Sequence, residues 1–184
     1  MPPVNIGKPA VAWALTGAGH FLSESVALIE ELCEKREVDV YLSRAATEIV
    51  PMYGLEARLR KASRETIREA GYSFPVAGRF FAGSYEALVV APVTGNTVSK
   101  FVTGIADTLV SSLFAQAGKS RVPICVMPTD VAEEVLSPTP EGQLVRVFPR
   151  PLDLSQTDKL EVMEGVSLVR SPEALRKWLA ESFL

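Results

Sequence analysis

The chain is poor in the two residue types that most often bind metals or carry redox chemistry. Among its 184 residues there is one histidine, His20, and there are two cysteines, Cys33 and Cys125. A single histidine excludes a histidine-rich metal site and any mechanism that needs two imidazoles. The cysteines are too few and too far apart for a CxxC redox pair or a zinc site, so no metal is expected. We expect both cysteines to be buried as small apolar side chains.

Long apolar runs and an excess of basic charge are missing as well. Apolar stretches such as ALVVAPV, from Ala87, stop at about seven residues, whereas a membrane-spanning helix needs roughly 18. The net charge of −3 provides no basic surface of the kind that nucleic-acid binding needs. The opening segment MPPVNIGKPA lacks the charged and apolar regions of a secretory signal. We therefore expect a cytoplasmic protein with neither a membrane nor a nucleic-acid partner.

What the chain does contain is the composition of an ordinary globular protein, with 47% hydrophobic and 22% charged residues. Its length suits a single domain with its own core. No internal repeat, low-complexity tract or linker divides it. Residues 1–184 are therefore expected to form one domain.

Apolar segments of strand length alternate with helical patterns along the chain. Buried strands are expected at residues 10–15, 38–43, 87–92 and 122–128. Helical patterns occur from Phe21, across 44–71 with an interruption around 51–54, late in the segment 93–119, and from Ser171. In the last of these, Ser171 is the expected N-cap and Pro172 the first helical residue.

The remaining segments are short and punctuated by proline and glycine. Residues 129–142 are expected to be a loop or flap, 143–148 an edge strand or hairpin arm, and 166–169 a last short strand. Strands that alternate with helices favour a three-layer α-β-α, Rossmann-like (flavodoxin-like) α/β fold with a mainly parallel sheet. Ligands bind such sheets at the carboxyl ends of the strands.

The first strand-to-helix junction, TGAGHF, contains a glycine pair at Gly17 and Gly19. The dinucleotide fingerprint would need glycine or alanine at the third position, where this chain has Leu22. It would also need an acid near the end of the second strand, where Ser43 and Arg44 occur instead. A P-loop is excluded because no Gly-Lys-Ser/Thr follows. Neither a dinucleotide nor a nucleoside triphosphate site is favoured here.

Hydroxyl side chains favour a different ligand at this junction. Thr16 and Ser43 are expected at the carboxyl ends of neighbouring strands. Two hydroxyls with nearby backbone amides suit a terminal phosphate monoester. The alternative is a tight turn that only packs a helix on the sheet.

The junction after residues 87–92 carries an unusual concentration of polar side chains, namely Thr94, Asn96, Thr97, Ser99 and Lys100. These residue types favour caps and loops because they compete for backbone hydrogen bonds. One N-cap needs only one of them. Several together with a lysine indicate a ligand site.

This junction carries a specific resemblance. P-V-T-G-N-T at 92–97, followed by G-I-A-D-T-L at 104–109, resembles the P-A-S-A-N-T signature of the homo-oligomeric FMN-binding flavoproteins. That family includes cysteine decarboxylases and prenyl-FMN synthases. The chain is most similar to the branch of archaeal flavoproteins and acceptor-type dihydromethanopterin reductases, whose three sequence blocks occur in order at 13–19, 41–43 and 90–109.

The resemblance implies FMN as the cofactor and a set of residues that bind it. Those that would hold the phosphate and ribityl chain are Thr16, Gly17, Ala18 and Ser43. Those that would line the isoalloxazine and the phosphate are Thr94, Gly95, Asn96 and Thr97. Lys100 and Asp107 match the same pattern; the alternatives are a solvated helix position for Lys100 and a helix junction or subunit contact for Asp107.

Two features separate the chain from the decarboxylase branch. Residues 44–80 lack its catalytic histidine, and VMPTDVAEE stands where that branch has its P-x-M-N-x-x-M-W substrate clamp. The prenyl-transfer branch is disfavoured too, because its serine-methionine-lysine turn and its basic phosphate-binding cluster are missing.

What the resemblance then implies is an FMN-dependent oxidoreductase that reduces 7,8-dihydromethanopterin to tetrahydromethanopterin in one-carbon metabolism. The external electron donor would be ferredoxin or a reduced nicotinamide system. A proton donor to the pterin is required; water could serve, and His20, Tyr85 and Asp107 are candidates. The alternatives are an FMN electron shuttle that accepts electrons from ferredoxin, and a phosphopantothenoylcysteine-decarboxylase-like flavoprotein.

The family also implies an oligomer, in which homotrimers with FMN at the subunit interface assemble into a larger shell. Aromatic residues cluster in the loop-like segment FPVAGRFFAGSYEAL, at Phe74, Phe80, Phe81 and Tyr85. They are expected to cover the core, or to contact a neighbouring subunit or the flavin. The loop at 129–142 is expected to close over a substrate or to form an oligomer contact.

Overall fold

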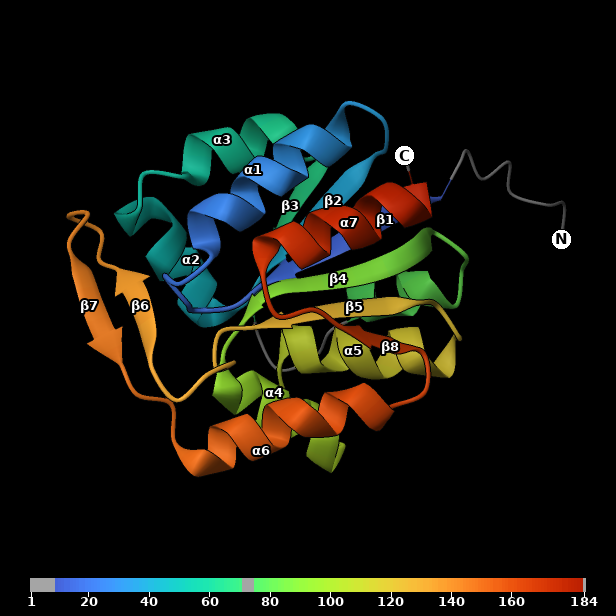
Figure 1. Ribbon diagram of the computed structural model, residues 1–184. Coiled ribbons are helices and arrows are strands. Elements are labelled where there is room, and N and C mark those ends of the chain that lie inside the picture. Colours follow the sequence, from blue (N-terminus) through green and yellow to red (C-terminus); the bar gives the residue numbers. More distant parts are fainter. Residues whose placement is uncertain (1–8, 71–74, 184) are drawn as a thin grey trace, which may run out of the picture.

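A six-stranded parallel sheet forms the centre of the computed structural model, which describes residues 9–70 and 75–183 (Figure 1). In the order β3-β2-β1-β4-β5-β8, its strands are Glu65–Arg68, Val38–Leu42, Ala10–Leu15, Tyr85–Val93, Ile124–Pro128 and Val166–Leu168. All five pairings between neighbouring strands are parallel. The four buried strands and the last short strand expected from the sequence are confirmed as β1, β2, β4, β5 and β8.

Helices cover both faces of this sheet. One face packs against α1 (Leu22–Cys33), α2 (Arg44–Met52), α3 (Glu56–Ala62) and α7 (Pro172–Phe183). The other packs against α5 (Leu109–Lys119), with α4 (Gly95–Thr103) and α6 (Pro151–Lys159) on the same side (Figure 1). The prediction of a three-layer α/β fold with a mainly parallel sheet is confirmed.

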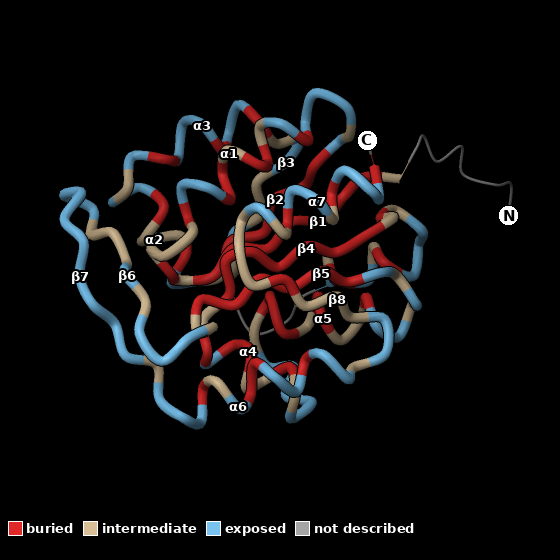
Figure 2. Tube along the Cα trace, viewed as in Figure 1, coloured by how far each residue is buried: buried red, intermediate tan, exposed pale blue. Residues whose placement is uncertain are grey.

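Strand β1 shows how the sequence divides the core between these faces. Successive side chains of a strand point to opposite sides. Accordingly, Trp13 packs toward α1 and α7, whereas Ala12 and Ala14 lie on the side of α5. The Trp13 indole Nε1 donates to the Ala91 carbonyl at 2.8 Å, which satisfies its polar group inside the core. Strands β1 and β5 are buried throughout their length, and β4 is buried except at Glu86 (Figure 2).

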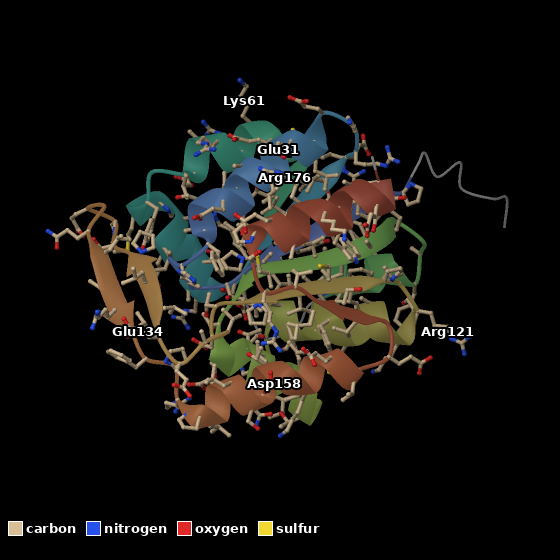
Figure 3. All side chains as sticks on the ribbon, viewed as in Figure 1. Glu31, Lys61, Arg121, Glu134, Asp158 and Arg176 are labelled. Carbon is tan, nitrogen blue, oxygen red and sulfur yellow. The ribbon has the colours of Figure 1, made fainter. Side chains whose placement is uncertain are left out.

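Helix ends follow the expected local rules in several places. The Ser171 hydroxyl accepts the Ala174 amide at 3.2 Å, and Pro172 begins α7, as predicted. Glu31 of α1 and Arg176 of α7 form an ion pair at 2.7 Å that joins the two helices on the surface (Figure 3). The expected interruption near residues 51–54 separates α2 from α3.

The helical expectation for residues 44–71 is wrong at its end. Residues Glu65–Arg68 form β3, an edge strand paired in parallel with β2. This strand carries charge at both ends: Glu65 pairs with Arg79 at 2.8 Å, and Arg68 pairs with Glu56 at 2.8 Å. Because an edge strand is half-exposed, it lacks the apolar character that identifies buried strands.

The segment after β5 also differs from the expected loop at 129–142. Val135–Pro138 (β6) and Leu144–Val147 (β7) form an antiparallel hairpin outside the main sheet (Figure 1). The expected hairpin arm at 143–148 is confirmed. Helix α6, which the sequence did not predict, and the short 3₁₀ segment Leu160–Val162 follow the hairpin.

The cysteines and the aromatic residues before β4 differ in their burial. Cys125 is buried, but Cys33 is exposed at the end of α1, where its Sγ donates to the Glu30 carbonyl at 3.0 Å. Phe80 is buried and Phe81 is 62% exposed, whereas Phe74 and residues 1–8 lie outside the described residues. Within the described ranges, no helix is long and apolar enough to cross a membrane.

Candidate functional site

A cleft lies at the carboxyl edge of the sheet, with a cavity volume of about 360 Å³. It brings together residues that follow β1, β2 and β4, as the parallel topology requires. The predicted site residues that line it are Thr16, Gly17, Ser43, Thr94, Asn96, Thr97 and Lys100. Its other lining residues are Arg44, Ala45, Glu69, Thr108 and Val110.

The N-termini of three helices converge on this cleft. Ser43 precedes α2, and its Oγ accepts the Ala46 amide at 3.1 Å. Thr94 precedes α4, and Thr108 precedes α5, where its Oγ1 accepts the Ser111 amide at 3.3 Å. The first-turn amides of a helix have no intrahelical acceptor and carry the positive end of its dipole. Three such ends beside one cavity favour anionic groups. The Glu69 carboxylate already accepts the first amides of α2 and α5, from Arg44 and Leu109, and the dipoles of all three helices suit a further anion such as a phosphate.

Thr16 forms the floor of the cleft rather than an open hydroxyl. Its Oγ1 accepts the Thr94 amide at 2.9 Å and donates to the Pro92 carbonyl at 3.1 Å. Both hydrogen bonds lie within the protein, and Thr16 is buried. This side chain therefore fixes the end of β1 against the turn that begins α4.

The two glycines of the TGAGHF junction allow close approach. A Cβ added at Gly17 would lie 2.4 Å from the Cβ of Ala45, in the first turn of α2. A Cβ added at Gly19 would lie 1.9 Å from the Tyr53 hydroxyl. That hydroxyl donates to the Pro138 carbonyl of β6 at 2.8 Å. The glycines thus let the junction pack against α2 and against the anchor of the hairpin.

Lys100 and Asp107 form an ion pair at 2.7 Å, and this pair lowers the pKa of Asp107. Lys100 lines the cleft, but Asp107 is exposed and does not. Asp107 therefore acts on the cleft through Lys100. This arrangement resembles the alternative of a helix-junction contact more than direct contact with a ligand.

A second cavity, of about 250 Å³, adjoins the cleft at Thr94 and lies beneath the hairpin. It contains the predicted residues Ala18, His20 and Gly95. The rest of its wall comes from the junction, the end of β5 and the two hairpin strands: Gly19, Thr94, Thr129, Asp130, Val135, Ser137 and Val147. The cavity therefore brings together predicted site residues from the junction after β1 and from the junction after β4. Its remaining cover is the hairpin, which contains no predicted site residue.

The ionisable groups around this second cavity have shifted pKa values. Desolvation lowers the pKa of His20, against the opposing effects of Glu24 and Asp130. Burial, together with the negative charge of Asp153, raises the pKa of Asp130. Arg150 forms charge-assisted hydrogen bonds with Asp153 at 2.7 and 2.8 Å and lowers its pKa. Two neighbouring carboxyl groups are thus shifted in opposite directions.

Tyr85, a proton-donor candidate from the sequence, lies outside both cavities. It begins β4, at the end of the strand opposite to Thr94. Its hydroxyl donates to the fully buried Asp39 at 2.7 Å and accepts from Tyr41. Asp39 is also held by Arg64, at 2.6 Å. Tyr85 therefore belongs to a structural network at the amino end of the sheet, and the structure does not bring this candidate to either cavity.

Three residues at the site were missed by the sequence reasoning. Glu69 directly follows β3. It was missed because residues 44–71 were expected to be helical, so no strand end was expected there. Thr108 precedes an apolar helical pattern and could have been recognised as an N-cap. Asp130 follows a buried strand, which is the criterion that identified Ser43 and Thr94. Among the described residues, no group of three His, Cys, Asp or Glu side chains could hold a metal ion.

Comparison with known proteins gives consistent matches. The family model described as Flavoprotein matches residues 2–180. A dihydromethanopterin reductase (acceptor) of Methanosarcina mazei is 46% identical over 140 residues, which cover 71% of this chain and 59% of the relative. The protein of the same name from Methanocaldococcus jannaschii is 45% identical over 130 residues, covering 65% of this chain and 53% of the relative. The chain thus spans little more than half the length of these relatives.

A solved structure matches nearly the whole chain. It is Burkholderia xenovorans DmrB in complex with FMN, described as a cubic protein cage for redox transfer. It superposes with a TM-score of 0.84 and is 37% identical in sequence, and the match covers 94% of each chain.

Proposed function

The chain belongs to the Flavoprotein family, and from this membership and the geometry of the cleft we propose that it is an FMN-dependent oxidoreductase. The proposed reaction is reduction of 7,8-dihydromethanopterin to tetrahydromethanopterin with electrons from an external donor. The observation that carries the proposal is the convergence of the N-termini of α2, α4 and α5 on one cavity.

The residues of the cleft fit FMN. A mononucleotide ends in one phosphate monoester, and three helix N-termini with the Ser43 and Thr94 hydroxyls suit that group. Lys100 adds a cation to the same wall. We propose that Thr16, Gly17, Ala18 and Ser43 shape the phosphate and ribityl end. The first turn of α4, with Gly95, Asn96 and Thr97, would lie along the ring system.

Two relatives of this chain support the proposed substrate. Two relatives at 45% and 46% identity are named dihydromethanopterin reductase (acceptor). DmrB, at 37% identity over nearly the whole chain, was solved with FMN. Because this chain spans only part of the two reductases, its activity on a pterin is proposed from their matching portion.

FMN, when bound, would supply hydride chemistry, in which two electrons from the donor pass to a carbon–nitrogen double bond of the pterin. The chain's own residues bind and orient the two molecules. The cleft holds the cofactor, and the cavity beneath the hairpin adjoins it at Thr94. This adjoining cavity favours a small-molecule substrate over the alternative of an electron shuttle, which needs no second pocket.

We propose that residues 1–184 act as one FMN-binding domain in the cytoplasm, and that copies of the chain form trimers that assemble into a larger shell. DmrB is described as a cubic cage, which supports an assembly.

The test is spectroscopic. The protein purified without added cofactor should show the absorbance of bound flavin, and apoprotein should recover it from FMN but not from riboflavin, because riboflavin lacks the phosphate. After anaerobic reduction of the bound flavin, 7,8-dihydromethanopterin should reoxidise it. A protein that binds no FMN would contradict the cofactor. Flavin that is reoxidised by one-electron acceptors but by no dihydropterin would favour the electron shuttle.

A further inference from the structure

The second cavity contains an acid that the sequence did not single out. Asp130 comes two residues after the end of β5 and lines the cavity beneath the hairpin together with His20. It is half-buried, and its carboxylate lies over the first turn of α4, because a Cβ added at Gly95 would meet its Oδ2. Its backbone is fixed as well, since the Thr157 hydroxyl donates to the Asp130 carbonyl at 3.0 Å.

The neighbouring carboxylate, Asp153, is paired with a cation. Arg150 donates hydrogen bonds to both oxygens of its side chain. Asp153 lies outside the lining of the cavity and remains negative beside Asp130. Burial of Asp130 and the charge of Asp153 favour its protonated form, whereas the Gly95 amide, Arg150 and His20 favour the charged form; the balance raises the pKa of Asp130. Of the two acids, Asp130 is the one that can both reach the cavity and carry a proton there.

His20 lines the same cavity. It is followed by Phe21, which adopts a left-handed backbone conformation with φ of 63° at the start of α1. The two aromatic rings pack with centroids 3.8 Å apart. A bulky residue rarely adopts this conformation, and such strain gathers at functional sites. The charged groups that act on His20 are Glu24 and Asp130; those that act on Asp130 are His20, Asp153 and Arg150.

We propose that Asp130 is the acid that protonates the substrate nitrogen, and that His20 is the group through which this carboxyl regains its proton from solvent. The inference rests on the proposed reductase function. Reduction of the N5=C6 bond of a dihydropterin adds a hydride at carbon and a proton at nitrogen. The hydride comes from the reduced flavin, which returns to its oxidised form, and the proton comes from the Asp130 carboxyl. Neither the exposed Asp107 nor water is then needed as the proton donor.

The decisive experiment compares two acceptors of the same electrons. FMN-loaded protein is reduced anaerobically and mixed either with 7,8-dihydromethanopterin or with ferricyanide, which takes up electrons without a proton. Asp130→Asn should slow reoxidation by the pterin by about 100-fold or more, the usual range for loss of a general acid, and leave the ferricyanide rate unchanged. Asp130→Glu should restore part of the pterin rate, and His20→Gln should reduce it less than Asp130→Asn does.

The matched control is Asp158→Asn, the same change at an exposed acid on α6 (Figure 3), which should leave both rates at the wild-type value. The wild-type pterin rate should fall as the pH rises, and this fall should be absent in Asp130→Asn. Equal pterin rates in wild type and in FMN-loaded Asp130→Asn would overturn the inference alone. A wild type that reduces ferricyanide but no pterin would overturn the proposed function, and the inference with it. If Asp130→Asn fails to hold FMN, a wild-type pterin rate that does not change with pH overturns the inference.

Discussion

The carboxylate of Glu69 accepts the backbone amide of Leu109 at 3.1 Å, although the two residues are separated by 40 positions in the sequence. Its other oxygen accepts the Arg44 amide at 2.8 Å. Leu109 begins α5 and Arg44 begins α2, and these helices pack on opposite faces of the sheet. One side chain thus joins two helix N-termini across the edge of the sheet and fixes two walls of the cleft.

Removal of this link should weaken the fold. Glu69→Ala leaves both amides without their acceptor, and we expect the free energy of unfolding to fall by about 1–2 kcal/mol. Glu69→Gln keeps one acceptor oxygen and should lower the free energy of unfolding by less. Urea denaturation of the apoprotein measures this free energy for both variants. Glu48→Ala, at an exposed position of α2, is the control, and equal losses at the two positions would argue against the link.

Gly17 is expected to be essential for the shape of the cleft. In Gly17→Ala the new methyl group would lie 2.4 Å from the Ala45 Cβ, so the first turn of α2 must move away. We expect a loss of stability of about 1–3 kcal/mol, typical of overpacking, and a loss of FMN affinity of about tenfold or more, which equals 1.4 kcal/mol.

The control for this change is Gly78→Ala, where an added Cβ has nothing within 4 Å. Flavin titration followed by fluorescence measures the affinity of both variants. If Gly17→Ala binds FMN as tightly as Gly78→Ala does, α2 does not form a wall of the phosphate site.

Asp130 and Asp153 should titrate on opposite sides of the ordinary aspartate pKa of 3.8. Arg150 lowers the pKa of Asp153, so its contribution to stability is present above pH 3.8 and is lost as the pH falls through its folded-state pKa. Burial raises the pKa of Asp130, so stability is lost as the pH rises from 3.8 through its folded-state pKa.

Asp130→Asn should therefore raise the urea midpoint at neutral pH and leave it unchanged well below pH 3.8. Carboxyl carbon shifts in an NMR titration would report the two pKa values directly. An Asp130 that ionises below Asp153 would contradict the described environment.

The hairpin exposes apolar side chains that an assembly would cover. Leu144 is 65% exposed and Phe148 is 64% exposed, close to the 52% exposed Leu136. Neighbouring exposed apolar residues often mark a protein interface. We expect Leu144→Ser together with Phe148→Ser to shift the assembly toward smaller species in light scattering.

Val162→Ser provides the comparison, because Val162 is 87% exposed but belongs to the 3₁₀ segment after α6 and not to the hairpin. It should leave the mass unchanged. A wild-type mass close to the 19.9 kDa of one chain would rule out the assembly itself.

Sequence reasoning succeeded where burial is strongest. The continuous apolar runs of β1, β4 and β5 reflect strands covered on both faces. The polar residues that follow β1, β2 and β4 meet in one cleft, because the carboxyl ends of parallel strands share one edge. The fold, and the position of Thr16, Ser43 and Thr94 around one cleft, could therefore be predicted from the sequence.

The failures occur where polar residues are buried or strands are exposed. Helix α6 buries Asp153, Gln156 and Thr157 rather than an apolar stripe, so its periodicity gives no helical signal. The edge strand β3 was missed for the opposite reason: its Glu65 and Arg68 are exposed, so the strand has no apolar run. With β3 misassigned, the position of Glu69 at the cleft could not be foreseen.

The hairpin stands apart from the main sheet, and this has a consequence for how such a protein can change. It is inserted between β5 and α6 and forms its own two-stranded sheet. Two strands alone are marginally stable in water, so its position depends on anchors such as the Tyr53–Pro138 hydrogen bond. Its residues can therefore be exchanged as a unit, with those anchors kept, without disturbing the packed core. An engineer could graft a different hairpin here to change the cavity beneath it and leave the adjoining cleft intact.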